Sequence, residues 1–317
     1  MALTRREAIG AGLAALAVAA PKARYRVGNT TNTRGGWEND VWLSFREAHE
    51  VGYRNVESFI HYFVDYWDKP KELAKRVDDI GVKFTTISNG GKMEMHFEDA
   101  SKHAKILEDH LRLGRLIREL GCTHMKINLG PRRPNGTTDE DLVHISKVLE
   151  ELGTKLKAEG IRLAVHAHMW AQFENQKEVD YVMAHTSPDH VYFVLDTGHV
   201  TMAGMDPVAL TKRLGHRILE FHMKDTKPEV RGGAKTRLDR PDMMGDPPFF
   251  PLGNGGVDFT AIKAHLDSIG WQGFLTVELD TSPWRPPKES ARISFNYLRD
   301  KLKLPADSFT ARRAGGL

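Results

Sequence analysis

The feature that most constrains the fold is an eightfold alternation of short β-like runs with longer amphipathic segments, which begins near Tyr25. Strands that alternate with helices predict parallel βαβ units, and eight such units close into a barrel. The predicted strands are residues 25–30, 53–58, 83–88, 124–129, 162–168, 191–196, 218–224 and 273–279. The predicted helices are residues 41–51, 69–80, 97–120, 139–159, 177–185, 206–214, 258–269 and 287–301. No GxGxxG turn follows the first strand, so we predict a (β/α)8 TIM barrel in preference to an open doubly wound sheet.

Three segments of different character follow one another along the 317 residues. Residues 1–20 contain Arg5 and Arg6 before a short alanine-rich apolar run, the pattern of a twin-arginine-type signal peptide. Because the run is too short to span a bilayer, we expect export to the periplasm with no stable membrane anchor; without a functional signal the protein would stay cytoplasmic. Residues 21–304 are expected to form the catalytic barrel, and residues 305–317 a flexible C-terminal tail.

The composition limits the kinds of partner that we expect for this chain. The net charge is only +3 and no basic block is interleaved with aromatic residues, so we do not expect nucleic acid as a partner. Cys122 is the one cysteine, which excludes an intrachain disulfide. The long loop 226–256, rich in Gly, Pro, Asp and Arg, is expected to be functional, as lids are. Histidines on predicted helices, such as His110, are expected on the surface. A small-molecule substrate is the expected partner, and the composition is compatible with a homo-oligomer.

Polar residues gather where the predicted strands end. Active sites of barrels lie at the C-terminal ends of their strands, and polar groups in apolar strands are costly unless they are paired or bind a ligand. The residues at these ends are Glu57, Lys126, Asn128, His166, His168, Asp196, His199, His222, Lys224, Glu278 and Asp280. Taken alone, Asp196 is compatible with a turn cap, and Glu278 with a lysine ion pair. Taken together, Asp, His and Glu on strands five to eight predict a divalent-metal site with open positions for substrate oxygens.

Several motifs carry a resemblance to a known family. The runs VLDTGHVTMAGMDP, RILEFHMKD, FPLGNGGVDF and GFLTVELD resemble the xylose-isomerase-like sugar isomerase/epimerase superfamily, and RLAVHAHMW is most similar to its inosose-dehydratase-like branch. The resemblance extends from residue 25 to about residue 302. It implies that Asp196, His222 and Glu278 bind the metal. The family has a glutamate at the fourth ligand position, on strand five, where this chain has His166.

The resemblance implies a metal-dependent sugar isomerase or epimerase that acts through an enediolate next to a carbonyl. Glu278 would remove the proton, and His166 would act as a metal ligand or as the second acid/base. Lys126, as a further catalytic group, and Lys224 would stabilise developing oxyanions. A structural ion pair is the alternative role for each of these lysines. The residues expected to contact a sugar or keto-sugar substrate are Glu57, His168, His199, Lys224 and Trp170. One divalent ion is expected, with Mn²⁺ as the first choice and Co²⁺, Zn²⁺ or Mg²⁺ as alternatives.

Three alternatives share the barrel or the site. The first is a metal-dependent lyase or dehydratase that acts on a keto-sugar, a 3-keto-glycoside or an inosose, because loss of a β-substituent starts from the same intermediate. The second is an abasic-site DNA endonuclease, which needs further histidines on strands two and three; strand three ends in Ser88 and Asn89 instead. The third is a barrel that binds sugar without turnover.

Overall fold

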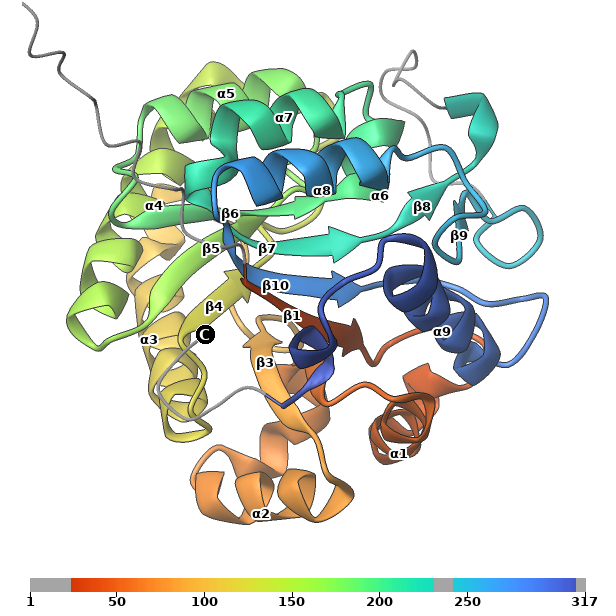
Figure 1. Ribbon diagram of the computed structural model, residues 1–317. Helices are drawn as coiled ribbons and strands as arrows, with labels where there is room; N and C mark the ends of the chain where they lie inside the picture. Colours follow the sequence, from red (N-terminus) through yellow and green to blue (C-terminus); the bar gives the residue numbers. More distant parts are fainter. Residues whose placement is uncertain (1–23, 231–241, 312–317) are drawn as a thin grey trace, which may run out of the picture.

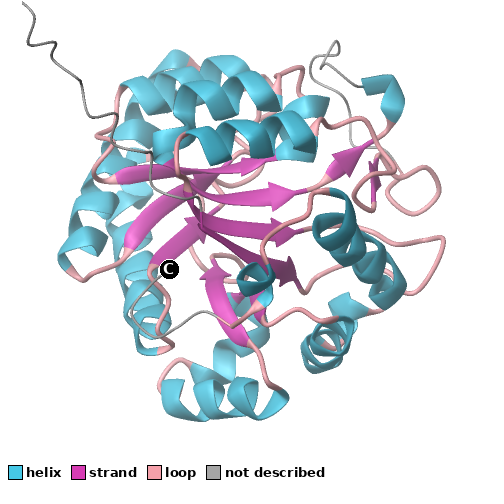
Figure 2. Cartoon of the chain, in the orientation of Figure 1, coloured by secondary structure: helices cyan, strands magenta, loops and turns pink. Residues whose placement is uncertain are grey.

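The computed structural model describes residues 24–230 and 242–311. At its centre, parallel strands form a ring that helices surround (Figures 1 and 2). The barrel strands are β1 (Arg24–Thr30), β2 (Asn55–Phe59), β3 (Lys83–Ser88), β4 (His124–Ile127), β5 (Arg162–His166), β6 (Val191–Asp196), β7 (Ile218–Met223) and β10 (Gln272–Val277). They run in the order β3-β2-β1-β10-β7-β6-β5-β4 with all paired neighbours parallel. The end strands β3 and β4 are also in contact, so the ring is nearly closed. The predicted (β/α)8 barrel is confirmed.

The outer layer follows the predicted helices, except that the helix predicted from residue 97 begins at His103. The helices are α1 (Val41–Val51), α2 (Pro70–Ile80), α3 (His103–Glu119), α4 (Asp139–Ala158), α5 (Gln176–Ala184), α7 (Pro207–Leu214), α8 (Phe259–Ser268) and α9 (Pro287–Asn296). Local chemistry sets their ends. Thr138 and Asp141 form a reciprocal capping box at the start of α4, and Gly81 takes the left-handed conformation that ends α2.

Side chains of the strands alternate between the inside of the barrel and the helix layer. On β7, Glu220 lies 2.8 Å from His124 of β4, and His222 lies 2.9 Å from Glu57 of β2, so both reach across the interior. Between them, Phe221 packs edge-on against Trp271. Every residue of β7 is buried. The interior of this barrel therefore holds polar side chains that pair with one another across it.

Four strands, β4, β5, β7 and β10, end one or two residues before the predicted boundary. β5, β7 and β10 stop early, which places His168, Lys224 and Glu278 in the loops that follow them. A short helix directly after β6, α6 (Thr197–Met202), was not predicted. All its residues are buried, so it lacks the polar face by which an amphipathic helix is recognised.

The chain after residue 305 differs in part from the predicted flexible tail. Ala306–Phe309 forms a 3₁₀ helix that packs on β1, with Ser308 buried. Asn55 Nδ2 on β2 donates to the Thr310 carbonyl oxygen at 3.0 Å. Residues 312–317 and the predicted signal peptide, residues 1–20, lie outside the described residues.

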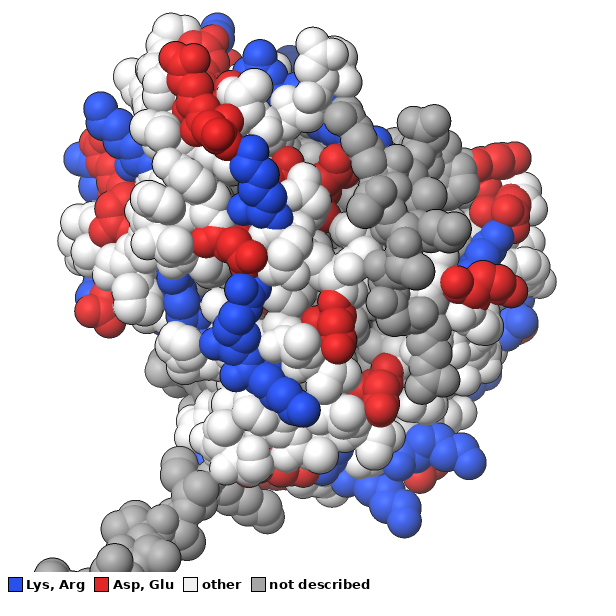
Figure 3. All heavy atoms as spheres, turned by 90° about the horizontal axis from the view of Figure 1, so that it is seen from above, with Lys and Arg blue, Asp and Glu red and all other residues white. Residues whose placement is uncertain are grey.

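Two surface features bear on the expected partners. Basic and acidic side chains are interspersed over the face seen in Figure 3. Within the described part of the chain, no helix combines the length and apolarity needed to cross a membrane.

Candidate metal centre

Four side chains from neighbouring barrel strands converge at the C-terminal mouth of the barrel. His166 and Asp196 are the last residues of β5 and β6, His222 lies in β7, and Glu278 directly follows β10. One ligand atom of each lies within 4.8 Å of the others, and all four side chains are buried. The structure thus brings together the four residues that the sequence predicts as metal ligands.

The spacing of these atoms suits ligation of one ion. His166 Nε2 lies 3.4 Å from Asp196 Oδ2, and His222 Nδ1 lies 3.7 Å from the same oxygen. Two ligands held at about 2.1 Å by one ion at the tetrahedral angle are about 3.4 Å apart. His222 Nδ1 also lies 2.5 Å from Glu278 Oε2. That contact is a hydrogen bond, and it must open by about 1 Å when both groups bind a metal.

Asp196 divides its two carboxylate oxygens between the backbone and the centre. Oδ1 accepts a hydrogen bond of 2.8 Å from the backbone N–H of His199, which caps α6. Oδ2 is left to face His166 and His222. The turn-cap interpretation and the metal-ligand interpretation of this residue are therefore compatible.

Behind His222 lies a carboxylate that fixes the ring. His222 Nε2 lies 2.9 Å from Glu57 Oε2, and Lys126 Nζ forms an ion pair with Glu57 Oε1 at 3.3 Å. A carboxylate in this position orients the imidazole and leaves the other nitrogen for a metal. Glu57, expected to contact substrate, is instead fully buried and reaches the centre through His222. Lys126 does line the cavity above the centre.

Opposite charges keep the cluster ionised. Burial alone would raise the pKa of Asp196, but the Lys224 ammonium and the surrounding histidines together outweigh burial and hold the pKa well below its usual range. Burial would also raise the pKa of Glu278, which Lys224 and His222 likewise hold well below its usual range. For His222, burial would lower the pKa, yet Glu57 and Glu278 raise it well above the usual value. The metal-free centre therefore holds ionised carboxylates around an imidazolium, and a metal must displace the Nδ1 proton.

A second cluster of potential metal ligands, formed by His168, His199 and Asp280, lies beside the first. A lysine ammonium already interacts with this second cluster. Lys224 Nζ lies 2.9 Å from His199 Nε2, 2.7 Å from Asp280 Oδ1 and 3.1 Å from Asp196 Oδ2. Burial would lower the pKa of Lys224, but the three surrounding carboxylates, Asp196, Asp280 and Glu278, together outweigh burial and raise the pKa above its usual value. A second divalent ion would meet this buried positive charge, so the arrangement suits one ion.

The donor set and the charge balance agree with one divalent cation. Four carboxylates face two lysines and the protonated His222, which leaves one negative charge in excess. The groups counted are Glu57, Asp196, Glu278, Asp280, Lys126, Lys224 and His222. Exchange of the His222 proton for a divalent ion makes this set neutral. Two imidazoles and two carboxylates suit Mn²⁺, Co²⁺ or Zn²⁺ better than Mg²⁺, which prefers oxygen ligands. The residues present therefore fit a divalent metal.

A cavity of about 220 Å³ opens over the centre. Its lining residues are Asn32, Arg34, Phe59, Lys126, Asn128, His166, His168, Met243, Glu278, Asp280 and Thr281. Of the residues predicted to contact substrate, His168 lies on this wall. His199 and Lys224 are buried just beneath it, and the half-buried Trp170 ring lies 5.8 Å from the His199 ring. Trp170 has a φ of 66°, which is rare for a bulky residue and is often found at functional sites.

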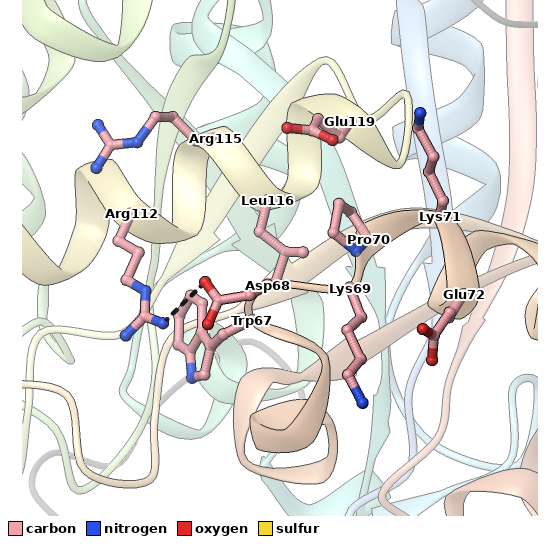
Figure 4. A pocket seen from close by; sticks show the side chains of 10 residues that line it. All are labelled: Trp67, Asp68, Lys69, Pro70, Lys71, Glu72, Arg112, Arg115, Leu116 and Glu119. Carbon is pink, nitrogen blue, oxygen red and sulfur yellow. Dashed lines mark ion pairs between the residues drawn. The ribbon is translucent and has the colours of Figure 1, made fainter.

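A larger hollow, of about 750 Å³, lies elsewhere, between the beginning of α2 and the outer face of α3. In Figure 4, Arg112 reaches from α3 toward Asp68 and Trp67. The Arg112–Asp68 ion pair measures 3.5 Å, and the guanidinium lies 4.5 Å from the Trp67 ring centroid. This hollow shares no lining residue with the cavity over the centre and holds no potential metal-ligand cluster among the described residues.

Sequence reasoning gave no role to several residues at the centre. Asp280 stands two residues after Glu278, so it lies on the same side of an extended chain, a signal that was available. Asn128 was noted at a strand end without a function. His110, expected on the surface, is fully buried and bonds to Asn89. A single histidine in an amphipathic helix carries no sequence signal for such a contact.

The strand-end cluster in a nearly closed parallel barrel defines a barrel protein with a candidate metal centre at its mouth. Comparison with known families agrees, because the family described as "Xylose isomerase-like TIM barrel" matches residues 45–301. The chain belongs to the xylose isomerase-like TIM-barrel family.

Three similar proteins illustrate the range of this family. The rhizopine catabolism protein MocC of Rhizobium meliloti is 33% identical over 263 residues, which cover 78% of this chain and 77% of MocC. Inosose dehydratase of Lacticaseibacillus casei is 29% identical over 170 residues, or 53% of this chain and little more than half, 57%, of the dehydratase. The solved structure of the IOLI protein with a zinc atom has a TM-score of 0.64 at 18% identity and covers 87% of this chain and 97% of IOLI. The last likeness shows the shared fold.

Proposed function

We propose that the protein is a metal-dependent lyase that acts on an inosose or a related polyhydroxylated keto-sugar. It would remove the proton next to the carbonyl and release the hydroxyl group one carbon further as water. The names of two relatives, a rhizopine catabolism protein and an inosose dehydratase, support this substrate class. The sequence favoured an isomerase or epimerase first and a lyase second, and the geometry of the centre favours the lyase.

The observation that carries the proposal is the histidine at the end of β5. A reaction that moves protons on both faces of a sugar needs an acid/base group on each side. His166 Nε2 faces Asp196 at 3.4 Å, and its Nδ1 is committed to Asn128 Oδ1 at 2.8 Å. Both nitrogens of His166 are thus engaged. Of the two carboxylates in the ligand cluster, Glu278 is the one that also lines the cavity. Elimination needs one base and one acid, which this site offers.

His166, Asp196, His222 and Glu278 would hold the ion. When bound, the ion would supply Lewis-acid polarisation of the substrate carbonyl, which acidifies the neighbouring proton. Glu278, ionised because its pKa is held well below the usual range, accepts that proton. Lys126, which lies on the cavity wall, donates a proton to the departing hydroxyl group. The C–H bond pair becomes the new double bond, and water leaves.

Isomerisation or epimerisation is the second candidate, and one observation favours it. Lys126 on β4 and Glu278 after β10 both line the cavity, from strands separated by three others in the sheet. If Lys126 returned a proton to carbon rather than to oxygen, the product would be an isomer. Both candidates share the first step.

The mass of the product separates the two candidates. We expect metal-reconstituted protein to convert an inosose or keto-sugar to a product lighter by one water, and a 3-keto-glycoside to a product that has lost its β-linked alcohol. A product isomeric with the substrate, heavier only by the deuterium it takes up from D₂O, would assign the protein to the isomerases. Glu278→Gln serves as the control, since it keeps an oxygen ligand but loses the base.

A further inference from the structure

A series of hydrogen bonds leads to His166 from the C-terminal ends of β3 and β4, where these two strands lie side by side. His166 Nδ1 lies 2.8 Å from Oδ1 of Asn128, the first residue after β4. An amide oxygen only accepts, so the ring proton resides on Nδ1. Nε2 then keeps its lone pair, and it faces Asp196 Oδ2 at 3.4 Å. With the ring proton on Nδ1, Nε2 and Asp196 Oδ2 are both acceptors, and their separation matches that of two ligands of one ion.

Asn128 is itself clamped by the side chain of Asn89, which directly follows β3. Asn89 Oδ1 accepts from the backbone N–H of Asn128 at 2.9 Å, and Asn89 Nδ2 donates to the backbone carbonyl of Asn128 at 2.9 Å. The side chain therefore pairs with both backbone groups, as a neighbouring strand would. This clamp fixes Asn128 at the point where β3 and β4 meet.

The clamp is anchored in turn by a buried histidine of α3. The second amide hydrogen of Asn89 is donated to His110 Nε2 at 3.0 Å, and His110 Nδ1 donates to the Ile106 carbonyl at 2.8 Å. Each donated hydrogen in this series of hydrogen bonds has one acceptor. The donor and the acceptor of every bond between Ile106 and His166 are therefore defined. Asn89 and His110 are both about 1% exposed or less, which excludes water as a competitor.

We propose that Asn128, held by Asn89 and His110, is a positioning residue that selects the Nδ1–H tautomer of His166 and so presents Nε2 to the metal. The proposal rests on the metal centre proposed above. A carboxylate ligand needs no such partner, because either oxygen can bind. A histidine ligand does, because the hydrogen bond at one nitrogen decides which nitrogen is free for the metal.

Two variants of nearly equal size separate positioning from a structural role. Asn128→Asp keeps an acceptor oxygen toward His166, and Asn128→Leu removes it. Both keep the backbone of residue 128, and hence its two bonds to Asn89. Nitrogen-15 NMR of the metal-free protein, with the His166 signals assigned by difference from His166→Gln, reports the tautomer directly. Cobalt titration of the same samples reports affinity and, through the Co²⁺ absorption bands, the ligand set.

We expect the Nδ1–H tautomer in the wild type and in Asn128→Asp, and its loss in Asn128→Leu. Cobalt affinity should fall by about 10–100-fold in Asn128→Leu and be retained in Asn128→Asp. An unchanged tautomer in a folded Asn128→Leu variant would overturn the proposal, as would an equal loss of affinity in both variants. Should the leucine variant not fold, Asn128→Ser, with a side chain too short to reach Nδ1, takes its place. If the wild type binds no metal, the proposed function fails, and the tautomer measurement still decides whether Asn128 orients His166.

Discussion

Burial of His110 should make the protein sensitive to acid in a way that one substitution removes. The side chain is fully buried, its Nε2 accepts from Asn89, and burial lowers its pKa to about 4. In the unfolded chain the pKa is about 6.5. Between these values the unfolded state binds more protons, so the free energy of unfolding decreases as the pH falls from 6.5 toward 4. From pH 7 to pH 5, the loss attributable to His110 is about 2 kcal/mol.

Urea unfolding of metal-free protein at the two pH values measures this loss. His110→Gln is the matched variant, because the glutamine oxygen can accept from Asn89 but does not titrate. All other titrating groups are common to both proteins, so we compare their losses between pH 7 and pH 5. The wild type should lose about 2 kcal/mol more than His110→Gln. Equal losses would refute the assignment of His110 as a buried neutral acceptor.

Three further predictions concern the centre and the N-terminus. Glu278→Gln should lower turnover by about 10²–10⁴-fold at saturating metal, and near-normal exchange of the substrate α-proton would show that another group is the base. Because Glu57 and Glu278 raise the pKa of His222, metal binding should release a proton, so affinity should fall by about tenfold per unit as the pH is lowered; a calorimetric affinity independent of pH contradicts this. We also propose twin-arginine export: replacing Arg5 and Arg6 by lysine should retain the precursor in the cytoplasm, and fractionation that finds the variant still in the periplasm would disprove it.

The barrel could be predicted from the sequence because each of its units repeats one physical pattern. Apolar runs of strand length, buried on both faces, alternate with amphipathic helices that end in glycine, as at Gly81. The exception is α6, which is buried on all sides and has no amphipathic period. The exact ends of the strands could not be predicted in the same way. Whether the backbone of a residue such as Glu278 pairs in the sheet depends on the neighbouring strand.

The ligand cluster was predictable for the same reason, since parallel strands bring their C-terminal ends together. The contacts that each ligand makes on its side away from the metal site were not predictable. Whether Glu57 faces substrate or the back of His222 depends on the twist of the barrel. The path from His110 through Asn89 to Asn128 depends on three residues far apart in sequence, none of which forms a motif.

Exchange of the substrate α-proton in D₂O tests the central claim most directly. The claim is that this barrel uses one divalent metal and Glu278 to remove a proton next to a carbonyl. NMR would follow an inosose with metal-free protein and with the same protein reconstituted with one equivalent of Mn²⁺ or Co²⁺. The account predicts loss of the α-proton signal with the reconstituted protein alone. Equal exchange with and without metal, or none with any substrate of the panel, would contradict it.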